Sequence, residues 1–238
     1  MFEKPELKYS LSEITKMQIE FAHLTLNIDT LKKLKYKNKI ENPILILPGF
    51  LTNGQFHFQL KNILSTYCYN VYYWDQGFNF GFNEKTFKHT VEYILSLYKK
   101  HKKEIILLGH SLGGVYAKEI AKFSPEIIHS IYTFGSPLFD MKGEHSPLKL
   151  IYYTFNPKHR NDNHTKFEKN IIDNYLKTPD VNLTSFYSKK DGVVHWTTSV
   201  LPEMKHLKNI EVDSSHCGML FNYDVINAFL QELFEIYE

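Results

Sequence analysis

The sequence predicts an α/β fold in which a mostly parallel sheet is flanked by helices. Short, dense apolar runs alternate along the chain with longer segments whose apolar residues recur every three or four positions. The short runs are typical of buried strands and the longer segments of amphipathic helices. Regular alternation of the two is typical of a parallel sheet that helices cover on both faces. The length of 238 residues suits one such domain, or one domain with an inserted cap.

The N-terminal segment, residues 1–40, predicts an amphipathic helix followed by a basic linker. Two interpretations remain open: the helix packs on the domain and the lysines face water, or residues 11–40 make a peripheral contact with a membrane or lipid surface. The apolar helix positions are Leu11, Ile14, Met17, Phe21, Leu24, Ile28 and Leu31, and the linker lysines are Lys32, Lys33, Lys35, Lys37 and Lys39.

The α/β domain itself is expected to span residues 41–238. Its predicted strands are the apolar runs at 43–49, 70–74, 104–109, 127–135, 183–188 and 209–212, and its predicted helices are 56–66, 84–102, 112–123 and 222–236. A polar, Asn-rich stretch at 138–178 interrupts this alternation. We expect that stretch to be an irregular cap or lid inserted over the carboxyl edge of the sheet, where open α/β sheets bind ligands.

The stretch GHSLGG indicates a nucleophilic serine, because Ser111 follows a predicted buried strand and precedes a predicted helix. A G-x-S-x-G sequence in that context forms a strained turn that exposes the serine hydroxyl. Small residues are needed around such a turn, and Gly109, Gly113 and Gly114 supply them. The alternative is an unreactive serine in a glycine-rich turn.

Two backbone N–H groups are candidates for an oxyanion hole. One belongs to Leu112, the residue after the serine, and the other to Phe50 in the loop after the first domain strand. Leu51 is the alternative to Phe50. Loss of one such donor typically raises a reaction barrier by about 3 kcal/mol.

An acidic residue and then a histidine follow the serine along the chain, which is the order Ser, Asp, His that goes with this kind of nucleophile turn. Asp191 follows the predicted strand 183–188, and His216 follows the predicted strand 209–212. Carboxyl ends of parallel strands share one sheet edge, so we expect Ser111, Asp191 and His216 to meet there. His216 would take the serine proton and Asp191 would orient the imidazole. The competing residues are His110, beside the serine, His195, in the same loop as Asp191, and Asp213, close to His216 in sequence.

Composition and motif content exclude several other classes of function. A net charge of +2 gives no indication of a nucleic-acid partner. Neither a phosphate-binding G-x-x-x-x-G-K loop nor an H-E-x-x-H zinc motif occurs, and His159 with His164 has no recognised zinc spacing. We therefore expect no cofactor and no metal.

The remaining sequence signals concern the compartment. The two cysteines, Cys68 and Cys217, are expected to be free thiols in a reducing environment. Neither a signal peptide nor an apolar membrane span is evident, so a cytoplasmic protein is expected, with peripheral membrane contact as the alternative.

The chain resembles the α/β-hydrolase superfamily, and within it the bacterial lipase- and esterase-like members. The motifs that carry the resemblance lie within about residues 43–221 and read PILILPGF, YYWDQGFNFG, LLGHSLGGVYAKEIAKFSPEIIHSIYTFGSP, FYSKKDGVVHW and VDSSHCGML. The resemblance implies an acyl-serine mechanism, with Ser111, Asp191 and His216 as triad and Phe50 and Leu112 as oxyanion hole. Many relatives read His-Gly where this chain reads Pro48-Gly49, a departure that affects only the oxyanion assignment.

The expected activity is hydrolysis of a carboxylic ester, from a lipid or another small molecule. Aromatic residues in the loops point to an apolar acyl chain, although core packing is the better explanation for most of them: Phe50, Phe56, Phe58, Phe78, Phe80, Phe82 and Trp196. An acyltransferase or thioesterase would use the same triad, and a non-catalytic membrane or protein-binding module is the alternative from another class. Activity should fall on acidification as His216 is protonated, with a midpoint near neutral pH or below.

Overall fold

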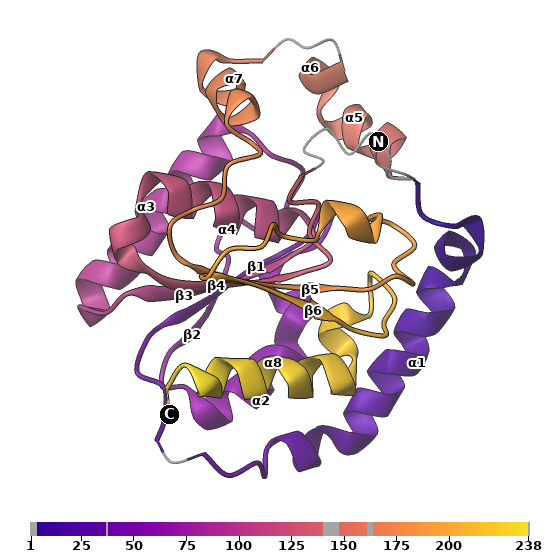
Figure 1. Cartoon of the computed structure of the whole chain (residues 1–238), viewed down its shortest axis with the longest axis vertical. Coiled ribbons are helices and arrows are strands. Elements are labelled where there is room, and N and C mark those ends of the chain that lie inside the picture. The colour runs from indigo at the N-terminus through magenta and orange to yellow at the C-terminus, as the bar shows by residue number, and fades with distance from the viewer. Residues whose placement is uncertain (1–3, 37, 140–147, 161–163, 238) are drawn as a thin grey trace.

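The computed structural model describes residues 4–36, 38–139, 148–160 and 164–237, and its centre is a six-stranded sheet (Figure 1). The strand order is β2-β1-β3-β4-β5-β6, and all neighbouring strands are parallel. The predicted α/β class with a mostly parallel sheet is therefore confirmed. The strands are β1 (Ile44–Leu47), β2 (Val71–Tyr73), β3 (Ile105–His110), β4 (Ile128–Phe134), β5 (Asn182–Tyr187) and β6 (Leu207–Glu211).

Helices cover both faces of the sheet, as Figure 1 shows. One face carries α3 (Glu84–His101) and α4 (Leu112–Phe123), and the other carries α2 (Phe58–Tyr67) and α8 (Tyr223–Glu235). Strand β1 contributes Ile44 and Ile46 to one buried cluster and Leu45 and Leu47 to the other. Because both of its faces are buried, such a strand reads as a continuous apolar run instead of an alternating one.

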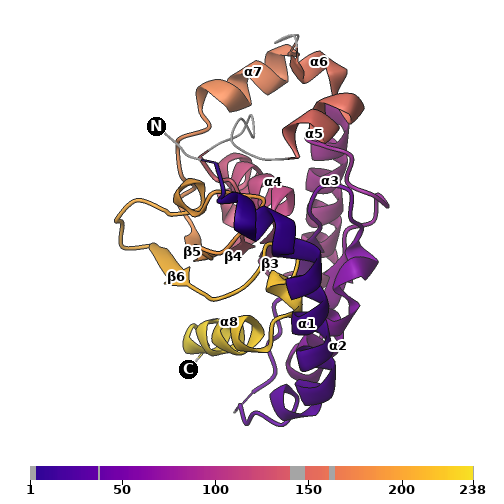
Figure 2. The same cartoon turned by 90° about the vertical axis from the view of Figure 1, so that its right-hand side faces the viewer.

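Helix α1 (Leu7–Leu31) runs along the side of this domain and packs against α8 (Figure 2). Its second half follows the predicted apolar face, since Leu24 and Leu31 are fully buried. Its first half does not, because Leu11 and Ile14 are 77% and 67% exposed while Glu13 is 5% exposed. The prediction fails there because the side of α1 that meets the domain contacts polar loops, described below. Lys37 of the predicted basic linker lies outside the described residues.

Three short helices lie between β4 and β5, where the sequence indicated an irregular stretch. They are α5 (Lys149–Phe155), α6 (Pro157–Arg160) and α7 (Lys166–Asp173), and they lie together at one end of the molecule (Figure 1). A capping box, in which Thr165 and Glu168 satisfy each other's backbone N–H groups, begins α7. Residues 140–147 and 161–163 of the expected 138–178 insertion lie outside the described residues.

Two further observations bear on the sequence predictions. Cys68 and Cys217 are both free thiols, as predicted. Within the described ranges, no helix combines the length and the apolar character that crossing a membrane would require.

Candidate active site

Ser111 forms the turn between β3 and α4. Its backbone has φ 52° and ψ −120°, a conformation that a residue with a side chain rarely adopts and that the surroundings must enforce. Its N–H donates to the carbonyl oxygen of Phe134 at 2.8 Å, which fixes the turn against β4. Leu112 is the first residue of α4, where backbone N–H groups lack a partner inside the helix and form the positive end of its dipole.

The glycines around this turn have no room for a side chain. A Cβ atom at Gly109 would collide with the backbone of Gly114. One at Gly113 would collide with the carbonyl oxygen of Leu47, and one at Gly114 with the side chain of Ser136. The strand, the turn and the helix therefore approach one another at backbone distance, and the loop after β1 is held against the turn.

Asp191 and His216 form a buried pair at the carboxyl ends of β5 and β6. The Nδ1 atom of His216 lies 2.7 Å from Oδ2 of Asp191. The other carboxylate oxygen, Oδ1, accepts hydrogen bonds from the N–H groups of Val193 and Val194 at 2.8 and 2.7 Å. With Nδ1–H donated to the carboxylate, Nε2 of His216 is the ring nitrogen that can accept a proton.

The environment of His216 favours its protonated form. Burial lowers the pKa of His216, but the charge and hydrogen bond of Asp191, together with the charge of Glu13, outweigh burial and raise the pKa above its ordinary value. The proton that this ring accepts is therefore held more firmly than on an ordinary histidine.

Gly135 brings the pair close to the serine turn. It follows Phe134, which accepts the Ser111 N–H, and it has φ +56°. A Cβ atom at Gly135 would come within 2.9 Å of Oδ2 of Asp191 and 3.1 Å of Nδ1 of His216. Within the part of the chain that the structure describes, no hydrogen bond joins the Ser111 hydroxyl to His216. Catalytic hydrogen bonds of this kind often form fully only when substrate is bound.

The loop after β1 brings Phe50 to the same place. A Cβ atom at Gly49 would lie 3.2 Å from the Cβ of Ser111, so the backbone of this loop touches the serine. The Leu51 N–H donates to the carbonyl oxygen of Asn79 at 2.8 Å and is therefore already used. Of the two donors that the sequence offered in this loop, Phe50 is the better placed.

The competing histidines and acid have other partners. His110 is buried, and its Nε2–H donates to the backbone oxygen of His216 at 3.0 Å. Burial, with the neighbouring histidines, lowers the pKa of His110 well below its usual range, so this ring is neutral. His195 bonds within its own loop, and Asp213 pairs with Lys190 at 2.5 Å on the surface. His110 thus supports the backbone of the His216 loop.

Glu13 of α1 joins the two loops that carry Asp191 and His216, and sequence reasoning missed it. Its carboxylate accepts three backbone N–H groups, from Gly192 at 2.7 Å, His216 at 3.0 Å and Cys217 at 3.0 Å. Between 179 and 204 residues separate these partners along the chain, so no local pattern could have indicated the contact.

Glu20 reinforces the same attachment two turns further along α1. Its carboxylate accepts the Ser215 N–H at 2.9 Å and the Ser214 hydroxyl at 2.7 Å, and Asn222 donates to it at 3.2 Å. The inner side of α1 is therefore acidic where it meets the His216 loop, which explains why the first half of the helix buries Glu13 and not an apolar residue.

Aromatic rings gather next to Phe50. Its ring centroid lies 5.3 Å from that of Tyr152 and 6.1 Å from that of Phe155, both on α5. Phe155 stacks on Phe80 at 5.3 Å, and Phe78 follows at 6.1 Å from Phe80. Phe78, Phe80 and Phe155 are each about half exposed. We call Phe50, Phe78, Phe80, Tyr152 and Phe155 the aromatic rim.

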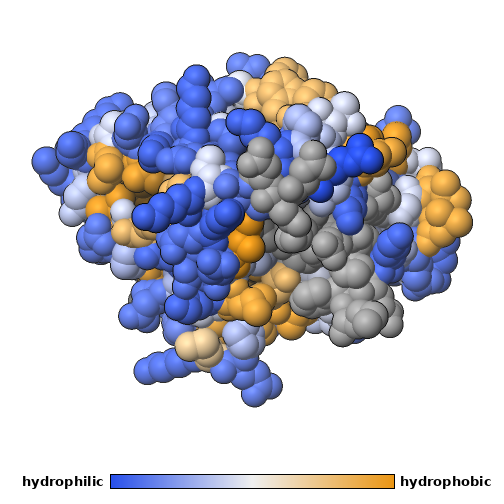
Figure 3. Space-filling model, turned by 90° about the horizontal axis from the view of Figure 1, so that it is seen from above, coloured by the Kyte–Doolittle hydropathy of each residue, from blue (hydrophilic) through white to orange (hydrophobic). Residues whose placement is uncertain are grey.

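Figure 3 views the molecule from the end that carries α5, α6 and α7, and separate hydrophobic patches interrupt a hydrophilic surface there. The other aromatic residues singled out in the sequence lie elsewhere. Phe82 is buried in the core, and Trp196 stacks on Tyr187 at a centroid distance of 5.8 Å. Phe56 and Phe58 line a surface groove beside α1.

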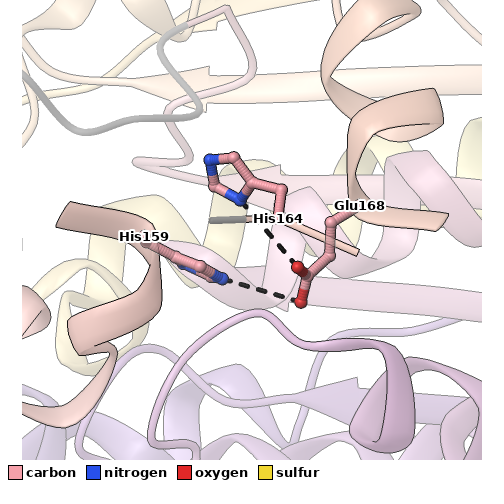
Figure 4. A group of neighbouring side chains, drawn as sticks. All are labelled: His159, His164 and Glu168. Atoms are coloured by element: carbon pink, nitrogen blue, oxygen red, sulfur yellow. Dashed lines mark ion pairs between the residues drawn. The ribbon is translucent and has the colours of Figure 1, made fainter. Parts of the chain in front are cut away.

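A second cluster of polar side chains lies in the α6–α7 segment (Figure 4). His159, His164 and Glu168 place one nitrogen or oxygen atom each within 4.8 Å of the others. Burial lowers the pKa of His159, so its ring favours the neutral form. The spacing of these residues matches no recognised zinc motif, and only the fold of the segment brings them together.

Comparison with known families identifies the chain. A family model described as "PGAP1-like alpha/beta domain" matches residues 83–216, which is more than half of the 238 residues. The chain belongs to the PGAP1-like alpha/beta domain family. The matched range contains Ser111, Asp191 and His216 of this PGAP1-like chain. A comparison with curated protein sequences gives no match.

Solved structures share the fold of the PGAP1-like chain at low sequence identity. A lipase-esterase related protein from Clostridium acetobutylicum is 18% identical, with a TM-score of 0.56 over 83% of this chain and 95% of that protein. Lipase BlEst2 of Bacillus licheniformis, in its mature form, is 13% identical, with a TM-score of 0.59 over 84% and 95%. An alpha/beta superfamily hydrolase from Oenococcus oeni is 14% identical, with a TM-score of 0.58 over 86% and 100%. The predicted α/β-hydrolase fold is thereby confirmed.

Proposed function

We propose that the PGAP1-like chain hydrolyses carboxylic esters through an acyl-serine intermediate. The observation that carries this proposal is the buried 2.7 Å contact between His216 and Asp191 beside a serine with φ 52°. Backbone strain of this kind persists only where the surrounding structure enforces it, and it concentrates at active sites. The names of the structural neighbours, among them lipases and esterases, point in the same direction.

The proposed reaction begins with attack of the Ser111 oxygen on the ester carbonyl carbon. Nε2 of His216 takes the hydroxyl proton, and Asp191 holds the ring and stabilises the imidazolium. The N–H groups of Phe50 and Leu112 bind the oxygen that becomes negative in the tetrahedral intermediate. The imidazolium then protonates the leaving alcohol, and a water molecule activated by the same ring releases the acid and restores the serine.

The aromatic rim supports an apolar acyl chain as the preferred substrate group. Its rings begin at Phe50, next to the serine, and extend outward through Phe155 to Phe80. Burial of an alkyl chain against such rings is favourable by about 0.8 kcal/mol for each methylene group. Activity on p-nitrophenyl esters should therefore rise as the acyl chain lengthens from acetate.

A fluorophosphonate probe tests the nucleophile directly. The wild-type chain should be labelled, Ser111→Ala should not be, and the control Ser65→Ala, a serine on the exposed side of α2, should be labelled as the wild type is. An unlabelled wild type, or equal labelling of Ser111→Ala, would refute the proposal.

Acyl transfer to an alcohol or thioester hydrolysis would use the same groups. Competition between water and an added alcohol for the acyl group, followed by product analysis, separates transfer from hydrolysis. A dominant ester product would replace the hydrolase proposal with a transferase.

A further inference from the structure

The three side chains in Figure 4 converge from α6, from α7 and from a position just before α7. His159 lies on α6, His164 precedes α7, and Glu168 lies in the first turn of α7. Nε2 of His159 is 3.6 Å from Oε1 of Glu168, and Nδ1 of His164 is 3.9 Å from Oε2. Both distances exceed a hydrogen bond. They approach the separation of about 3.3 Å between ligand atoms that each lie about 2.0 Å from one tetrahedral zinc ion.

Two neighbouring groups already fix the orientation that metal ligands need. The hydroxyl of Tyr152 bonds to Nδ1 of His159 at 3.0 Å, which leaves Nε2 directed at Glu168. The N–H of Thr165 donates to Oε2 of Glu168 at 2.9 Å, which holds the carboxylate in place. Outer partners of this kind orient the ligands of metal sites and strengthen metal binding.

The cluster also has space at its centre. A cavity of about 30 Å³ lies among these residues, and Phe82, Tyr153 and Ile172 complete its wall. One water molecule needs about 10–15 Å³ of such space, so the cavity has room for an ion and a water molecule. The three side chains therefore surround a small space.

We propose that His159, His164 and Glu168 bind one zinc-class divalent cation, with a water molecule as the fourth ligand. Two imidazole nitrogens and one carboxylate oxygen form a donor set that suits zinc, whereas calcium and magnesium prefer oxygen ligands throughout. The site is independent of the Ser111 chemistry and does not rest on the proposed function.

A bound ion would fasten α6 to α7 beside the aromatic rim. Tyr152, which contacts His159, also lies 5.3 Å from the Phe50 ring and accepts the Phe82 N–H at 3.3 Å. The ion would therefore act as a structural clamp on the segment whose residues Tyr152 and Phe155 belong to the aromatic rim.

Titration of the full, untagged, metal-free chain with zinc chloride tests the proposal, with a chromophoric chelator in competition. The wild type should bind one equivalent of zinc. His159→Gln, His164→Gln and Glu168→Gln should each weaken binding about 100-fold or more, because loss of an outer partner alone costs about 10- to 100-fold. Glu168→Gln keeps the helix cap, since glutamine serves equally in a capping box. The control His89→Gln removes a surface histidine and should bind as the wild type does.

Two further measurements keep the proposal falsifiable if a ligand variant does not fold. Tyr152→Phe removes only the outer hydroxyl and should weaken zinc binding about 10- to 100-fold. Zinc should also raise the Tm of the wild type but leave that of Glu168→Gln unchanged. A wild type that takes up no zinc at micromolar concentration would overturn the proposal. Equal affinity of the wild type, Tyr152→Phe and every folded ligand variant would also overturn it, because the zinc would then reside on other histidines.

Discussion

At the scale of single residues, the protonation of His216 links the site to pH. Asp191 and Glu13 outweigh burial and raise the pKa of this ring above the ordinary 6.5. A raised pKa means that the ring still holds its proton when the pH has climbed past 6.5, and a protonated ring cannot act as a base. We therefore predict that kcat/KM falls on acidification with a midpoint above 6.5. Rates on a soluble ester between pH 5 and 9 would show this, and a flat profile would contradict the role of His216.

Glu13 is the residue through which α1 acts on the site. Glu13→Gln removes the negative charge of the carboxylate that accepts hydrogen bonds from the N–H groups of Gly192, His216 and Cys217. Loss of charged hydrogen bonds in a buried position should lower the free energy of unfolding by about 1.5–3 kcal/mol. Because the His216 loop is then less firmly placed, kcat/KM should fall about 10- to 100-fold.

The pH profile separates an electrostatic role of Glu13 from a purely structural one. The Glu13 charge contributes to the raised pKa of His216, so the activity midpoint of Glu13→Gln should move to lower pH. The control Glu6→Gln changes an exposed carboxylate of the same segment and should leave rate and midpoint unchanged. A midpoint that does not move in Glu13→Gln would show that the residue only supports the fold.

Local signals explain which site residues could be predicted. Ser111 directly follows β3, and Asp191 and His216 lie in the loops that follow β5 and β6, so the strand before each residue indicates its place at the sheet edge. Glu13 carries no such signal, and the position of Gly135 directly after β4 does not reveal which side chains it must accommodate. The role of Glu13 depends on partners about 200 residues away, and the need for glycine at 135 depends on the side chains of Asp191 and His216.

At the scale of elements, α4 fastens the segment that holds α5, α6 and α7. Lys118 is fully buried in α4, and its ammonium group donates to the carbonyl oxygens of Leu138 at 2.6 Å and Tyr175 at 2.5 Å. These two residues lie where the chain leaves β4 and where it ends α7. One side chain therefore ties both ends of the segment to the sheet layer, although burial lowers the pKa of Lys118 to about 8.

Replacement of this lysine should loosen the segment. Lys118→Met keeps most of the volume but removes the ammonium group that donates to the Leu138 and Tyr175 carbonyl oxygens, so the free energy of unfolding should fall by about 2–4 kcal/mol. Urea denaturation would measure the change. The exposed Lys85→Met on α3 provides the matched control and should stay within about 0.5 kcal/mol of the wild type. Equal stability of Lys118→Met and the wild type would contradict the role of Lys118 in tying the segment to the sheet layer.

The difference between local sequence signals and long-range contacts also explains which helices and strands could be predicted. The central strands β1, β3, β4 and β5 and the long helices follow from apolar periodicity, because tertiary burial imposes that pattern on the sequence. The edge strands β2 and β6 are only partly buried, and short apolar runs mark them more weakly. Helices α5 and α6 are short and bury no residue fully, so no amphipathic pattern marks them. Only α7 carries a local signal, the pair Thr165 and Glu168 at capping-box spacing.

At the scale of the whole molecule, α1 is part of the domain core as well as a surface element. Leu24 and Leu31 belong to the buried cluster that α8 and α2 also form, while Glu13 and Glu20 hold the loops at the sheet edge. The outer side of α1 is different, because Leu7, Leu11 and Ile14 are between 67% and 77% exposed. Lys8 and Lys16 lie on the same stretch of the helix.

We propose that this outer side of α1 contacts an anionic lipid surface, since apolar side chains flanked by lysines are suited to the interface of a bilayer. Deletion of residues 1–40 cannot test the proposal, because it would also remove the buried contacts of Leu24 and the carboxylate of Glu13.

The double variant Leu11→Ser/Ile14→Ser changes only exposed positions and should fold as the wild type does. In flotation with phosphatidylglycerol-containing vesicles, the wild type should float and the double variant should not. Leu176→Ser, an equally exposed leucine after α7, should float as the wild type does. A wild type that stays at the bottom of the gradient, or a double variant that floats equally well, would refute the contact.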